Sequence, residues 1–496
     1  MTAILAMDQG TTGTTCLVVH ADGRVLGRGY REITQHYPQP GWVEHDPLEI
    51  VQRTMEAAQA AMAEALATTG VRPVAIGITN QRETVVLWDR ATGVPVAPAI
   101  VWQDRRTAPR CADLQSQAAW IAERTGLVTD PYFSATKLEW LLNRPGLRAR
   151  AVAGELAAGT IDSWVIWQLT GGRSHVTDHT NASRTMLYDL ETRAWSPALC
   201  ALFDIPMALL PQILPSAGYF GETVAEPLGC VLPILGVAGD QQAALYGQGG
   251  WSAGDAKNTY GTGAFLLMNT GAARPAPGDG LLTTMACDAA GGPAYAVEAS
   301  IFVAGAAVQW LRDGLGVIAA AEETEALAAS LVGNDGVYFV PALTGLGAPD
   351  WEPEARGTIV GLTRGTTRAH LARAALEAMA YATADVLAVM RRAGGLSVDR
   401  LRVDGGATRN NWLMQFQADL LGVPVERPAM VETTALGAAG LAGRTAGLWR
   451  DGDAFLAARR TDHFTPGDGA SAAQQGHQGW RRAVRATLGW SRDVSR

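Results

Sequence analysis

Lysine is almost missing from this chain of 496 residues, in which Lys137 and Lys257 are the only two. Neither stands in a G-x-x-x-x-G-K-[ST] segment, so the sequence excludes a P-loop. Any nucleoside triphosphate must therefore be held by other loops and a metal ion. The 48 acidic residues outnumber the 40 basic ones, for a net charge of −8. Because this balance leaves no general basic surface, we expect no nucleic-acid partner.

Cysteine is scarce, and long apolar runs are absent. The five cysteines are odd in number and form no C-x-x-C pair, which argues against a zinc site and against a disulfide framework. No run approaches the roughly 20 apolar residues of a membrane span. The segment 1–7 lacks a basic region and a small-residue cleavage site, so we expect no signal peptide. These absences predict free thiols in a cytoplasmic protein without stable membrane association.

The length predicts two domains, since one core rarely serves so many residues. With 48% hydrophobic and 18% charged residues, the chain is globular in composition. A Gly-rich stretch at 247–254 suggests domains 1–248 and 249–496. We expect the Gly-, Ala- and Gln-rich segment 464–479 to be a surface segment.

Strand and helix patterns alternate, which predicts an α/β fold with mixed or parallel sheets. The expected strands are 3–7, 16–19, 24–34, 74–78, 85–88, 231–237 and 401–403, and the expected helices are 47–68, 371–392 and 411–421. Two Gly- and Thr-rich turns, at 8–15 and 257–263, each stand between two expected strands. This repeated pattern either indicates a duplicated fold or arises by chance.

The first turn, Asp8 to Gly13, carries the residue types that bind phosphate and a metal ion. An Asp at a strand end can hold Mg²⁺, usually through water. Glycines admit a phosphate close to the backbone, and threonine hydroxyls donate to its oxygens. An ordinary hairpin turn uses the same residues. The second turn, which contains Thr262, favours the phosphate hypothesis, because two such hairpins could hold one triphosphate.

Arg82 and Glu83 lie between two apolar strands. Glutamate accepts hydrogen bonds from hydroxyl groups and arginine donates several, so the two side chains can recognise the hydroxyls of a polyol. A solvated loop with a local ion pair is the alternative. Trp102 and Tyr132 are candidates to cover the carbon side of such a ligand. For a Trp in a chain with 15 of them, core packing is the alternative.

Asp240 follows the expected strand 231–237 and is a candidate general base for an attacking hydroxyl. The following Gln-Gln-Ala-Ala also fits a helix that Asp240 would cap. The Gly-Gly pair after strand 401–403 can lie against a nucleoside or form a plain connection. His175 and His179 are spaced i,i+4 without the carboxylate of an HExxH motif, so we predict no metal site there.

The sequence resembles the FGGY carbohydrate kinases over nearly its whole length, and among them the members that phosphorylate glycerol. The matching segments are DQGTTGTT at 8–15, PGWVEHDPLEI at 40–50, GITNQRET at 77–84, AIVWQDRRT at 99–107, DPYFSATK at 130–137, VTDHTNASRTML at 176–187, AGDQQAALYGQ at 238–248, KNTYGTG at 257–263, GLGAPDWEPEARG at 345–357, LRVDGGATRNNWLMQFQADLLG at 401–422 and TTALGAAGLAG at 433–443. Segments 132–144 and 357–377 resemble the two family signatures.

The resemblance implies two ribonuclease H-like domains of the actin/sugar-kinase type, with the active site in the cleft between them. It implies ATP-dependent phosphorylation of glycerol to sn-glycerol 3-phosphate in glycerol uptake and catabolism, with Mg²⁺ as cofactor and a homo-oligomer, dimer or tetramer, as the assembly. Asp240 would be the general base and Asp8 would serve Mg²⁺. The implied glycerol-binding residues are Arg82, Glu83, Trp102, Tyr132, Asp240, Gln241 and Phe265. The implied ATP-binding residues are Thr11, Thr12, Gly13, Thr262, Gly305, Gln309, Gly406 and Asn410.

Three departures from the family pattern limit what can be carried over. Thr15 stands where the family often has Arg, which removes one phosphate contact. The segment 225–232 has no Arg or Lys, so we predict no inhibition by a sugar bisphosphate there. The segment after Pro466 also differs, so the resemblance does not support control by a partner docking there.

Two rival functions remain to be tested. A kinase of the same family could act on a pentulose or on gluconate. An actin- or chaperone-like ATPase would share the fold but would have no use for Arg82, Glu83, Trp102 and Asp240. Stimulation of ATP turnover by glycerol discriminates between these possibilities.

Overall fold

The computed structural model describes residues 2–226, 228–276, 278–430, 432–457 and 460–493. These residues form two compact units that are discontinuous in sequence. Unit 1 contains Met1–Ser252, Thr283–Ala296 and Glu432–Arg459, and unit 2 contains Ala253–Leu282, Val297–Val431 and Arg460–Arg496. All seven expected strands and three expected helices are present, with ends displaced by three residues or fewer.

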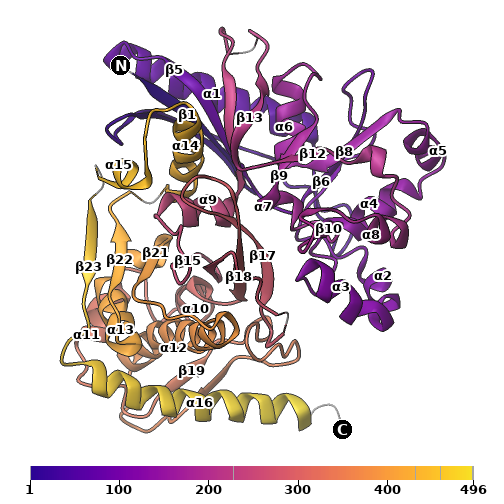
Figure 1. Ribbon diagram of the computed structural model, residues 1–496. Coiled ribbons are helices and arrows are strands. Elements are labelled where there is room, and N and C mark those ends of the chain that lie inside the picture. The colour runs from indigo at the N-terminus through magenta and orange to yellow at the C-terminus, as the bar shows by residue number, and fades with distance from the viewer. Residues whose placement is uncertain (1, 227, 277, 431, 458–459, 494–496) are drawn as a thin grey trace. The chain divides into compact units, whose positions relative to one another are not determined.

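The main sheet of unit 1 has the order β13-β14-β5-β1-β2-β3. Figure 1 labels its strands β1, β5 and β13. Strands β1, β2 and β3 are antiparallel neighbours, whereas β1, β5 and β14 run parallel. The bounds are β1 (Ala3–Gln9), β2 (Gly13–His20), β3 (Val25–Glu32), β5 (Pro73–Asn80), β13 (Ala217–Glu222) and β14 (Pro233–Gly239). The carboxyl ends of β1, β5 and β14 therefore meet at one edge.

Helices cover both faces of this sheet. Side chains alternate along a strand, and Ile76 and Ile78 of β5 pack in the core with helix α1 (Pro47–Thr69). Gly77 between them faces helix α14 (Thr433–Thr445) on the opposite side. A Cβ atom at Gly77 would lie 2.1 Å from the carbonyl oxygen of Ala438, so α14 can approach the strand this closely only because residue 77 is glycine.

A second sheet in unit 1 has the order β4-β7-β6-β8. The bounds are β4 (Glu44–His45), β6 (Val85–Asp89), β7 (Ala99–Ile100) and β8 (Leu156–Thr160). The other elements of this unit are α2 (Ala108–Asp113), η1 (Gln115–Gln117), α3 (Ala118–Thr125), α4 (Ser134–Leu142), α5 (Leu147–Val152), α6 (Ile161–Leu169), β9 (Val176–Asp178), α7 (His179–Ala182), β10 (Tyr188–Asp189), β11 (Ala194–Trp195), α8 (Pro197–Leu202), η2 (Met207–Leu209), β12 (Gln212–Leu214), α9 (Asp240–Gly247) and α15 (Gly452–Leu456).

In unit 2, strands β16, β15, β21, β22 and β23 follow one another in this order in a sheet, which repeats the pattern of the main sheet of unit 1. Strand β15 is antiparallel to β16 and parallel to β21, just as β1 is antiparallel to β2 and parallel to β5. The bounds are β15 (Ala256–Tyr260), β16 (Ala264–Gly271), β17 (Leu282–Cys287), β18 (Pro293–Ile301), β21 (Leu401–Asp404), β22 (Val425–Pro428) and β23 (Thr461–Phe464). This shared topology supports a duplicated fold and accounts for the two Gly- and Thr-rich turns.

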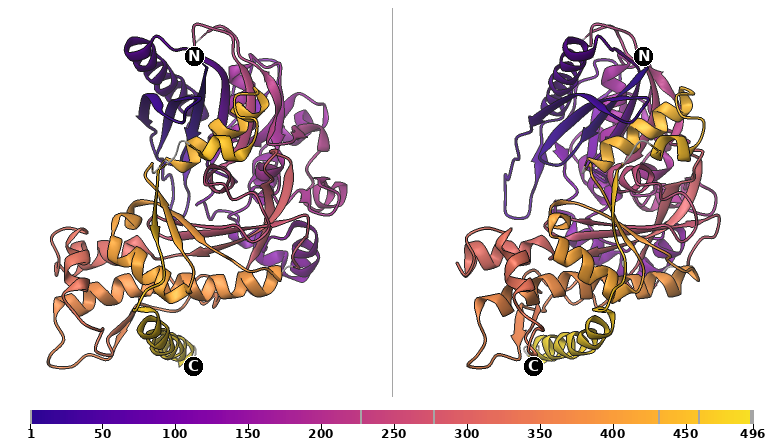
Figure 2. Two further views of the ribbon diagram at one scale, coloured as in Figure 1. Left: turned by 60° about the vertical axis from the view of Figure 1, so that its left-hand side comes forward. Right: turned by 90° about the vertical axis from the view of Figure 1, so that its left-hand side faces the viewer.

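Long helices complete unit 2 (Figure 2). Helix α12 (Arg368–Gly394) contributes most of its side chains to the core, and α13 (Asn411–Leu421) and α16 (Ala470–Asp493) pack beside it. The segment 464–479 lies mostly at the surface, as expected, but from residue 470 it is the beginning of α16, which buries only Ala473 of this segment. The remaining elements are α10 (Gly305–Gln309), η3 (Trp310–Gly314), α11 (Glu323–Ala329), β19 (Tyr338–Val340), β20 (Thr358–Val360) and η4 (Gly406–Arg409).

The structure also bears on the cysteines and on membrane-spanning helices. All five cysteines are free thiols, as expected. No helix in the described part of the chain is both long enough and apolar enough to cross a membrane.

Candidate active site

The parallel strands of unit 1 bring three predicted segments to one edge of the sheet. Asp8 lies near the end of β1, Arg82 and Glu83 follow β5, and Asp240 follows β14. Adjacent strand ends place their side chains close together, and open α/β sheets bind ligands at such edges. The tertiary structure thus gathers residues that are up to 232 positions apart, from residue 8 to residue 240.

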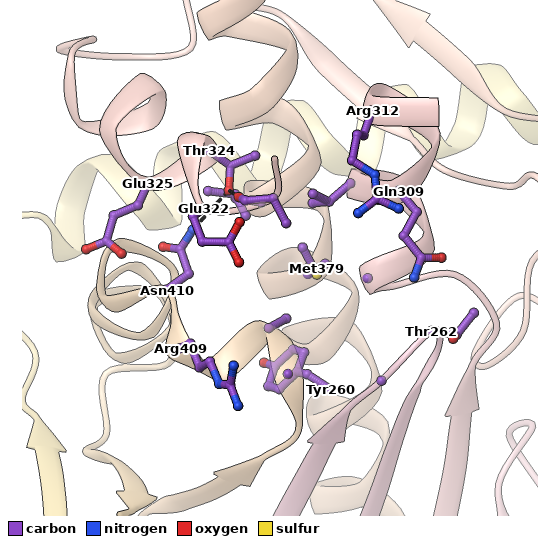
Figure 3. Close-up of a pocket in the computed structure, with 17 residues that line it drawn as sticks. Tyr260, Thr262, Gln309, Arg312, Glu322, Thr324, Glu325, Met379, Arg409 and Asn410 are labelled. Atoms are coloured by element: carbon purple, nitrogen blue, oxygen red, sulfur yellow. Dashed lines mark hydrogen bonds between the residues drawn. The ribbon is translucent and has the colours of Figure 1, made fainter. Parts of the chain in front are cut away.

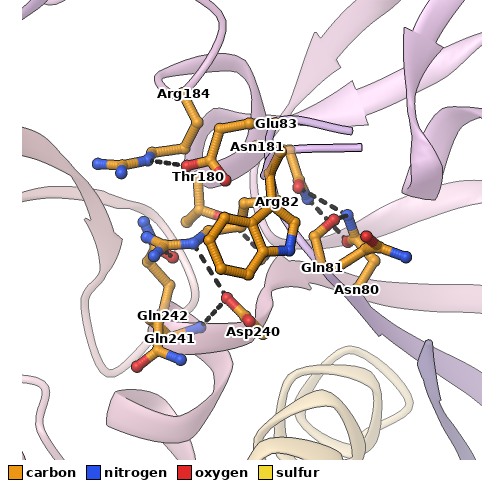
Figure 4. A network of polar contacts seen from close by, with 12 residues as sticks. Asn80, Gln81, Arg82, Glu83, Thr180, Asn181, Arg184, Asp240, Gln241 and Gln242 are labelled. Carbon is orange, nitrogen blue, oxygen red and sulfur yellow. Dashed lines mark hydrogen bonds and ion pairs between the residues drawn. The ribbon is translucent and has the colours of Figure 1, made fainter. Parts of the chain in front are cut away.

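Arg82 and Asp240 form an ion pair at this edge (Figure 4). Arg82 Nε lies 3.0 Å from Asp240 Oδ1, and Arg82 Nη1 donates to Gln242 Oε1 at 3.3 Å. The backbone N–H of Gln241 donates to the same Asp240 oxygen at 2.7 Å. Arg82 is buried, whereas the Asp240 side chain is 33% exposed. The carboxylate is therefore held from one side and open on the other.

The alternative role of Asp240 as a helix cap is wrong. Gly239 is the N-cap of α9, and Asp240 is the first helical residue. Its carboxylate is fixed by Arg82 and by the neighbouring N–H of Gln241 instead. A negative charge in the first turn of a helix is also stabilised by the helix dipole.

Glu83 is buried and has an unusual backbone conformation, with φ at 61°. Its carboxylate Oε1 accepts a hydrogen bond from Arg184 Nε at 2.6 Å, and its carbonyl accepts one from Ser134 Oγ at 2.9 Å. The alternative of a solvated loop is therefore excluded for Arg82 and Glu83, which are both buried. Sequence reasoning missed Arg184, which the spacing along the chain does not connect to Glu83.

Trp102 and Tyr132 lie together, with ring centroids 5.6 Å apart in an edge-to-face arrangement. Trp102 Nε1 donates to Thr11 Oγ1 at 2.9 Å, so this indole joins the aromatic pair to the first Gly- and Thr-rich turn. Tyr132 is anchored by a hydrogen bond from its backbone N–H to Asp130. Trp102 is only partly buried, which fits a wall of a site better than core packing.

The turn between β1 and β2 is closed by a hydrogen bond from Gly10 N to the carbonyl of Gly13 at 2.9 Å. Gln35 Nε2 donates to the carbonyl of Thr11 at 2.7 Å, and Gln81 Nε2 donates to that of Gly10 at 3.3 Å. His45 joins both glutamines, through Gln35 Oε1 at 2.8 Å and Gln81 Nε2 at 3.5 Å. The side-chain amide groups of Gln35 and Gln81 therefore hold the turn that contains Thr11, Thr12 and Gly13.

Two buried histidines of unit 1 predict that acid destabilises the fold. Burial lowers the pKa of His45 to about 4, assisted by the charge of His36. Burial also lowers the pKa of His175 to about 4, although Ala158 O accepts a hydrogen bond from its ring. A His pKa that is lower in the folded state than in the unfolded state contributes stability above pH 6.5, and this stability is lost as the pH falls.

Between pH 6.5 and pH 5 we expect each histidine to cost about 1.5 kcal/mol, since each pH unit is worth about 1.4 kcal/mol. Urea unfolding at a series of pH values measures the slope. His175→Gln should flatten the slope, while His463→Gln, an exposed control in unit 2, should leave it unchanged. Equal slopes for wild type and His175→Gln would contradict this expectation.

Asp8 lies in an acidic environment. Burial, together with the charges of Asp240 and Glu432, raises the pKa of Asp8 to about 7. Within the described residues, no three His, Cys, Asp or Glu side chains lie close enough together to hold a metal ion. Mg²⁺ commonly takes only one or two carboxylates and completes its shell with phosphate and water. Burial and the neighbouring negative charges disfavour the ionised form of Asp8, and a bound cation would stabilise it. The Asp8 carboxyl group therefore fits a Mg²⁺ site.

A pocket of about 390 Å³ in unit 2 contains all five residues of that unit that the sequence assigned to the nucleotide (Figure 3). These residues are Thr262, Gly305, Gln309, Gly406 and Asn410. The turn before β16 is closed by Gly261 N and the carbonyl of Gly263 at 2.8 Å, as its counterpart is in unit 1. The described pocket also has an apolar part, formed by Val308, Leu376, Met379 and Ala407.

The pocket floor depends on glycine at residue 405, where φ is 91° and a Cβ atom would lie 2.3 Å from the carbonyl oxygen of Tyr260. Asn410 caps α13 by accepting from Leu413 N at 2.9 Å, and its amide donates to Thr324 at 3.2 Å. The sequence did not identify Arg312, Glu322, Thr324, Glu325 and Arg409 as lining residues. Arg312, Glu322, Thr324 and Glu325 stand outside the recognised motifs, and Arg409 stands inside the segment 401–422 without a role that the motif suggested.

The remaining predicted residues are placed as follows. Phe265 lies on β16 of unit 2 and is partly buried. His175 and His179 face different partners, Arg90 and Tyr188 respectively. Residue 227 of the segment 225–232 lies outside the described residues, and the expected lack of sugar-bisphosphate inhibition stays a prediction.

The chain matches the N-terminal domain of the FGGY family of carbohydrate kinases at residues 3–247 and the C-terminal domain at residues 256–446. It is 56% identical to a glycerol kinase of Dechloromonas aromatica over 98% of both chains, and 57% identical to one of Acidovorax ebreus over 98% of this chain and 99% of that one. The fold is similar to a crystal structure of Plasmodium falciparum glycerol kinase with ADP, with a TM-score of 0.92, 36% identity and 98% coverage of both chains. The chain therefore belongs to the FGGY family of carbohydrate kinases.

Proposed function

We propose that this protein transfers the γ-phosphoryl group of ATP to glycerol and forms sn-glycerol 3-phosphate. The observation that carries the proposal is the buried pair of Arg82 and Glu83 beside a half-open Asp240 carboxylate. This arrangement offers fixed donors and acceptors to a small polyol and a base to one of its hydroxyls. The high identity to glycerol kinases over nearly the full chain supports glycerol as the acceptor.

On the polyol side, Arg82, Glu83, Tyr132 and Gln241 would bind hydroxyl groups. Trp102 and Phe265 would pack on the carbon atoms. Asp240 would take the proton from the attacking hydroxyl as the new oxygen–phosphorus bond forms. Because the carboxylate is already fixed by Arg82, little reorganisation is needed during the reaction.

On the nucleotide side, the pocket of unit 2 would hold the adenine and ribose of ATP. Gly305, Gln309, Gly406 and Asn410 line it, and Thr262, which also lines it, would contact phosphate. Thr11, Thr12 and Gly13 would donate to phosphate oxygens through hydroxyl and backbone N–H groups. Asp8 would hold Mg²⁺, which when bound neutralises charge on the β- and γ-phosphates. Excluding water from the reacting groups would limit wasteful hydrolysis of ATP.

The test is ADP release by the purified protein with Mg-ATP, followed by a coupled assay. Glycerol is compared with xylulose, ribulose, gluconate and no acceptor, and an arm with excess EDTA tests the metal requirement. We expect strong turnover with glycerol alone and none with EDTA. Turnover with another acceptor would support the kinase reaction but show that glycerol is not the substrate. Turnover without any acceptor would favour an actin- or chaperone-like ATPase.

We further propose that the chain has two domains. Residues 1–248 would form the domain that binds the polyol and phosphate, and residues 249–496 the domain that binds the nucleotide. The matches to the family at 3–247 and 256–446 support this division of the sequence. We also propose a cytoplasmic protein, to which five free thiols are suited. A homo-oligomer, dimer or tetramer, is the proposed assembly, and size-exclusion chromatography with light scattering tests it.

A further inference from the structure

Glu83 occupies a strained position in the polyol site. Its φ of 61° lies in the left-handed region, which a residue with a side chain rarely adopts. Such strain costs on the order of 1–3 kcal/mol and persists only where surrounding contacts hold it. Ser134 Oγ holds the carbonyl of Glu83 at 2.9 Å, and the N–H of Thr84 closes a tight turn onto the carbonyl of Arg82 at 2.7 Å.

Arg184 holds the carboxylate of this strained residue. It follows the short helix α7, and its side chain is fully buried. Its Nε donates to Glu83 Oε1 at 2.6 Å, and its guanidinium lies 5.6 Å from the ring centre of Tyr132 and 5.3 Å from that of Phe133. Removing one partner of a buried ion pair leaves the other charge unpaired, which strongly destabilises the folded protein. Arg184 and Glu83 therefore hold each other in place.

A second buried cation holds the adjoining aromatic wall. Lys137 of α4 is fully buried, and its Nζ donates to the carbonyl oxygens of Pro131 at 2.5 Å, Tyr132 at 2.7 Å and Phe133 at 3.3 Å. These three carbonyls fix the main chain that carries the Tyr132 ring. The guanidinium of Arg184 therefore contacts both the Glu83 carboxylate and the ring of Tyr132, whose main chain Lys137 holds.

Arg184 and Arg82 contact different carboxylates. Figure 4 shows Arg82 directed to Asp240 and Gln242, whereas Arg184 is directed to Glu83 on the far side of the network. Arg82 thus contacts the candidate base. Arg184 contacts the candidate acceptor of hydroxyl hydrogen bonds.

We propose that Arg184 is a positioning residue for polyol binding: it orients the Glu83 carboxylate, and with it the Tyr132 ring, so that both meet the substrate in one fixed geometry. This inference rests on the proposed function, because it assumes that Glu83 accepts hydrogen bonds from the polyol. Arg184 acts through Glu83 and does not take part in phosphoryl transfer. Its loss weakens binding of the ground state and the transition state alike, which raises KM and changes kcat little.

The test is a set of variants measured with glycerol and with ATP as the varied substrate. Arg184→Lys keeps the charge but loses the Nε geometry, and we expect its glycerol KM to rise about 10-fold. Arg184→Gln should raise it about 100-fold, the range expected for a lost charged hydrogen bond. The KM for ATP should stay within about twofold of wild type in both. Arg193→Gln is the matched control, since Arg193 packs on Tyr295 outside the network.

A double variant separates positioning from a structural role and guards against misfolding. Glu83→Gln with Arg184→Met removes both buried charges, so we expect it to fold. Its glycerol KM should match that of Glu83→Gln alone within about threefold, because no carboxylate is left to position. Additive losses, an unchanged KM in Arg184→Lys, or equal damage to both substrates would overturn the proposal.

The same experiment distinguishes this inference from the proposed function. Wild-type turnover is measured first with each acceptor. If another polyol replaces glycerol, the proposed substrate fails, and the variants are compared on that polyol with the same expectations. If no acceptor stimulates turnover, both the function and the inference are overturned.

Discussion

Asp240→Asn should lower kcat by about 10²- to 10⁴-fold while the protein stays folded, which corresponds to about 3–5 kcal/mol in the barrier. The amide keeps the shape of the side chain and can still accept from Arg82 and from the N–H of Gln241, as the carboxylate does at 3.0 and 2.7 Å. It cannot take the proton of an attacking hydroxyl. Among the described residues, Oδ2 of Asp240 has no hydrogen-bond donor, so this oxygen is open to the substrate.

The measurement is steady-state turnover with saturating glycerol and Mg-ATP. Asp113→Asn provides the control, because Asp113 is exposed in the same unit and lies in α2. Retained nucleotide binding by calorimetry would show that Asp240→Asn has kept its fold. Near-normal turnover by that folded variant would show that Asp240 is not the general base.

Asp385→Ala should loosen the attachment of the last helix and cost about 2–4 kcal/mol. Asp385 is buried on α12 and accepts three hydrogen bonds from α16: His477 Nε2 at 2.8 Å, Trp480 Nε1 at 2.8 Å and Arg481 Nη1 at 2.7 Å. Burial alone would raise the pKa of Asp385, but His477, Trp480 and Arg481 hold it below its usual value. The Arg481 contact contributes little of this, because its side chain is 53% exposed and solvent screens the charge.

Hydrogen exchange of the amides in α16 measures this directly. A loss of about 2 kcal/mol would speed exchange of that helix about 30-fold. Because the Asp385 pKa is lowered on folding, its contribution is present above pH 4 and is lost as the pH falls below that value. Asp399→Ala, at an exposed position of unit 2, should leave exchange unchanged, and equal rates in the two variants would refute the role of Asp385.

The contribution of Asp385 shows where sequence analysis stopped. The segment 464–479 is rich in Gly and Ala, and local composition predicts a surface segment. The segment does lie mostly at the surface, but from residue 470 it forms α16, whose Trp480 and His477 stack on Tyr381 with centroids 5.8 and 5.7 Å apart. Local composition did not predict this helix or its attachment, because contacts between residues about 95 positions apart are contained in no local pattern.

The sequence alone predicted seven of the strands, the helices α1, α12 and α13, and the repeated Gly- and Thr-rich turns, but not the long helix α16. It did so because alternation of apolar residues and turn chemistry are local properties. It also proposed Arg82, Glu83, Asp240 and Asn410 as chemistry-bearing residues through short motifs. Their neighbours along the chain carry the signal, so no tertiary information was needed.

Only the tertiary structure determines which charged side chains lie close together. Parallel pairing of β1, β5 and β14 brings Asp8, Arg82 and Asp240 to one sheet edge, and burial then raises the pKa of Asp8. It also placed Arg184 on Glu83 across 101 residues. Burial and charge pairing depend on distances in space, and these are set by the packing of the whole unit and not by the local sequence.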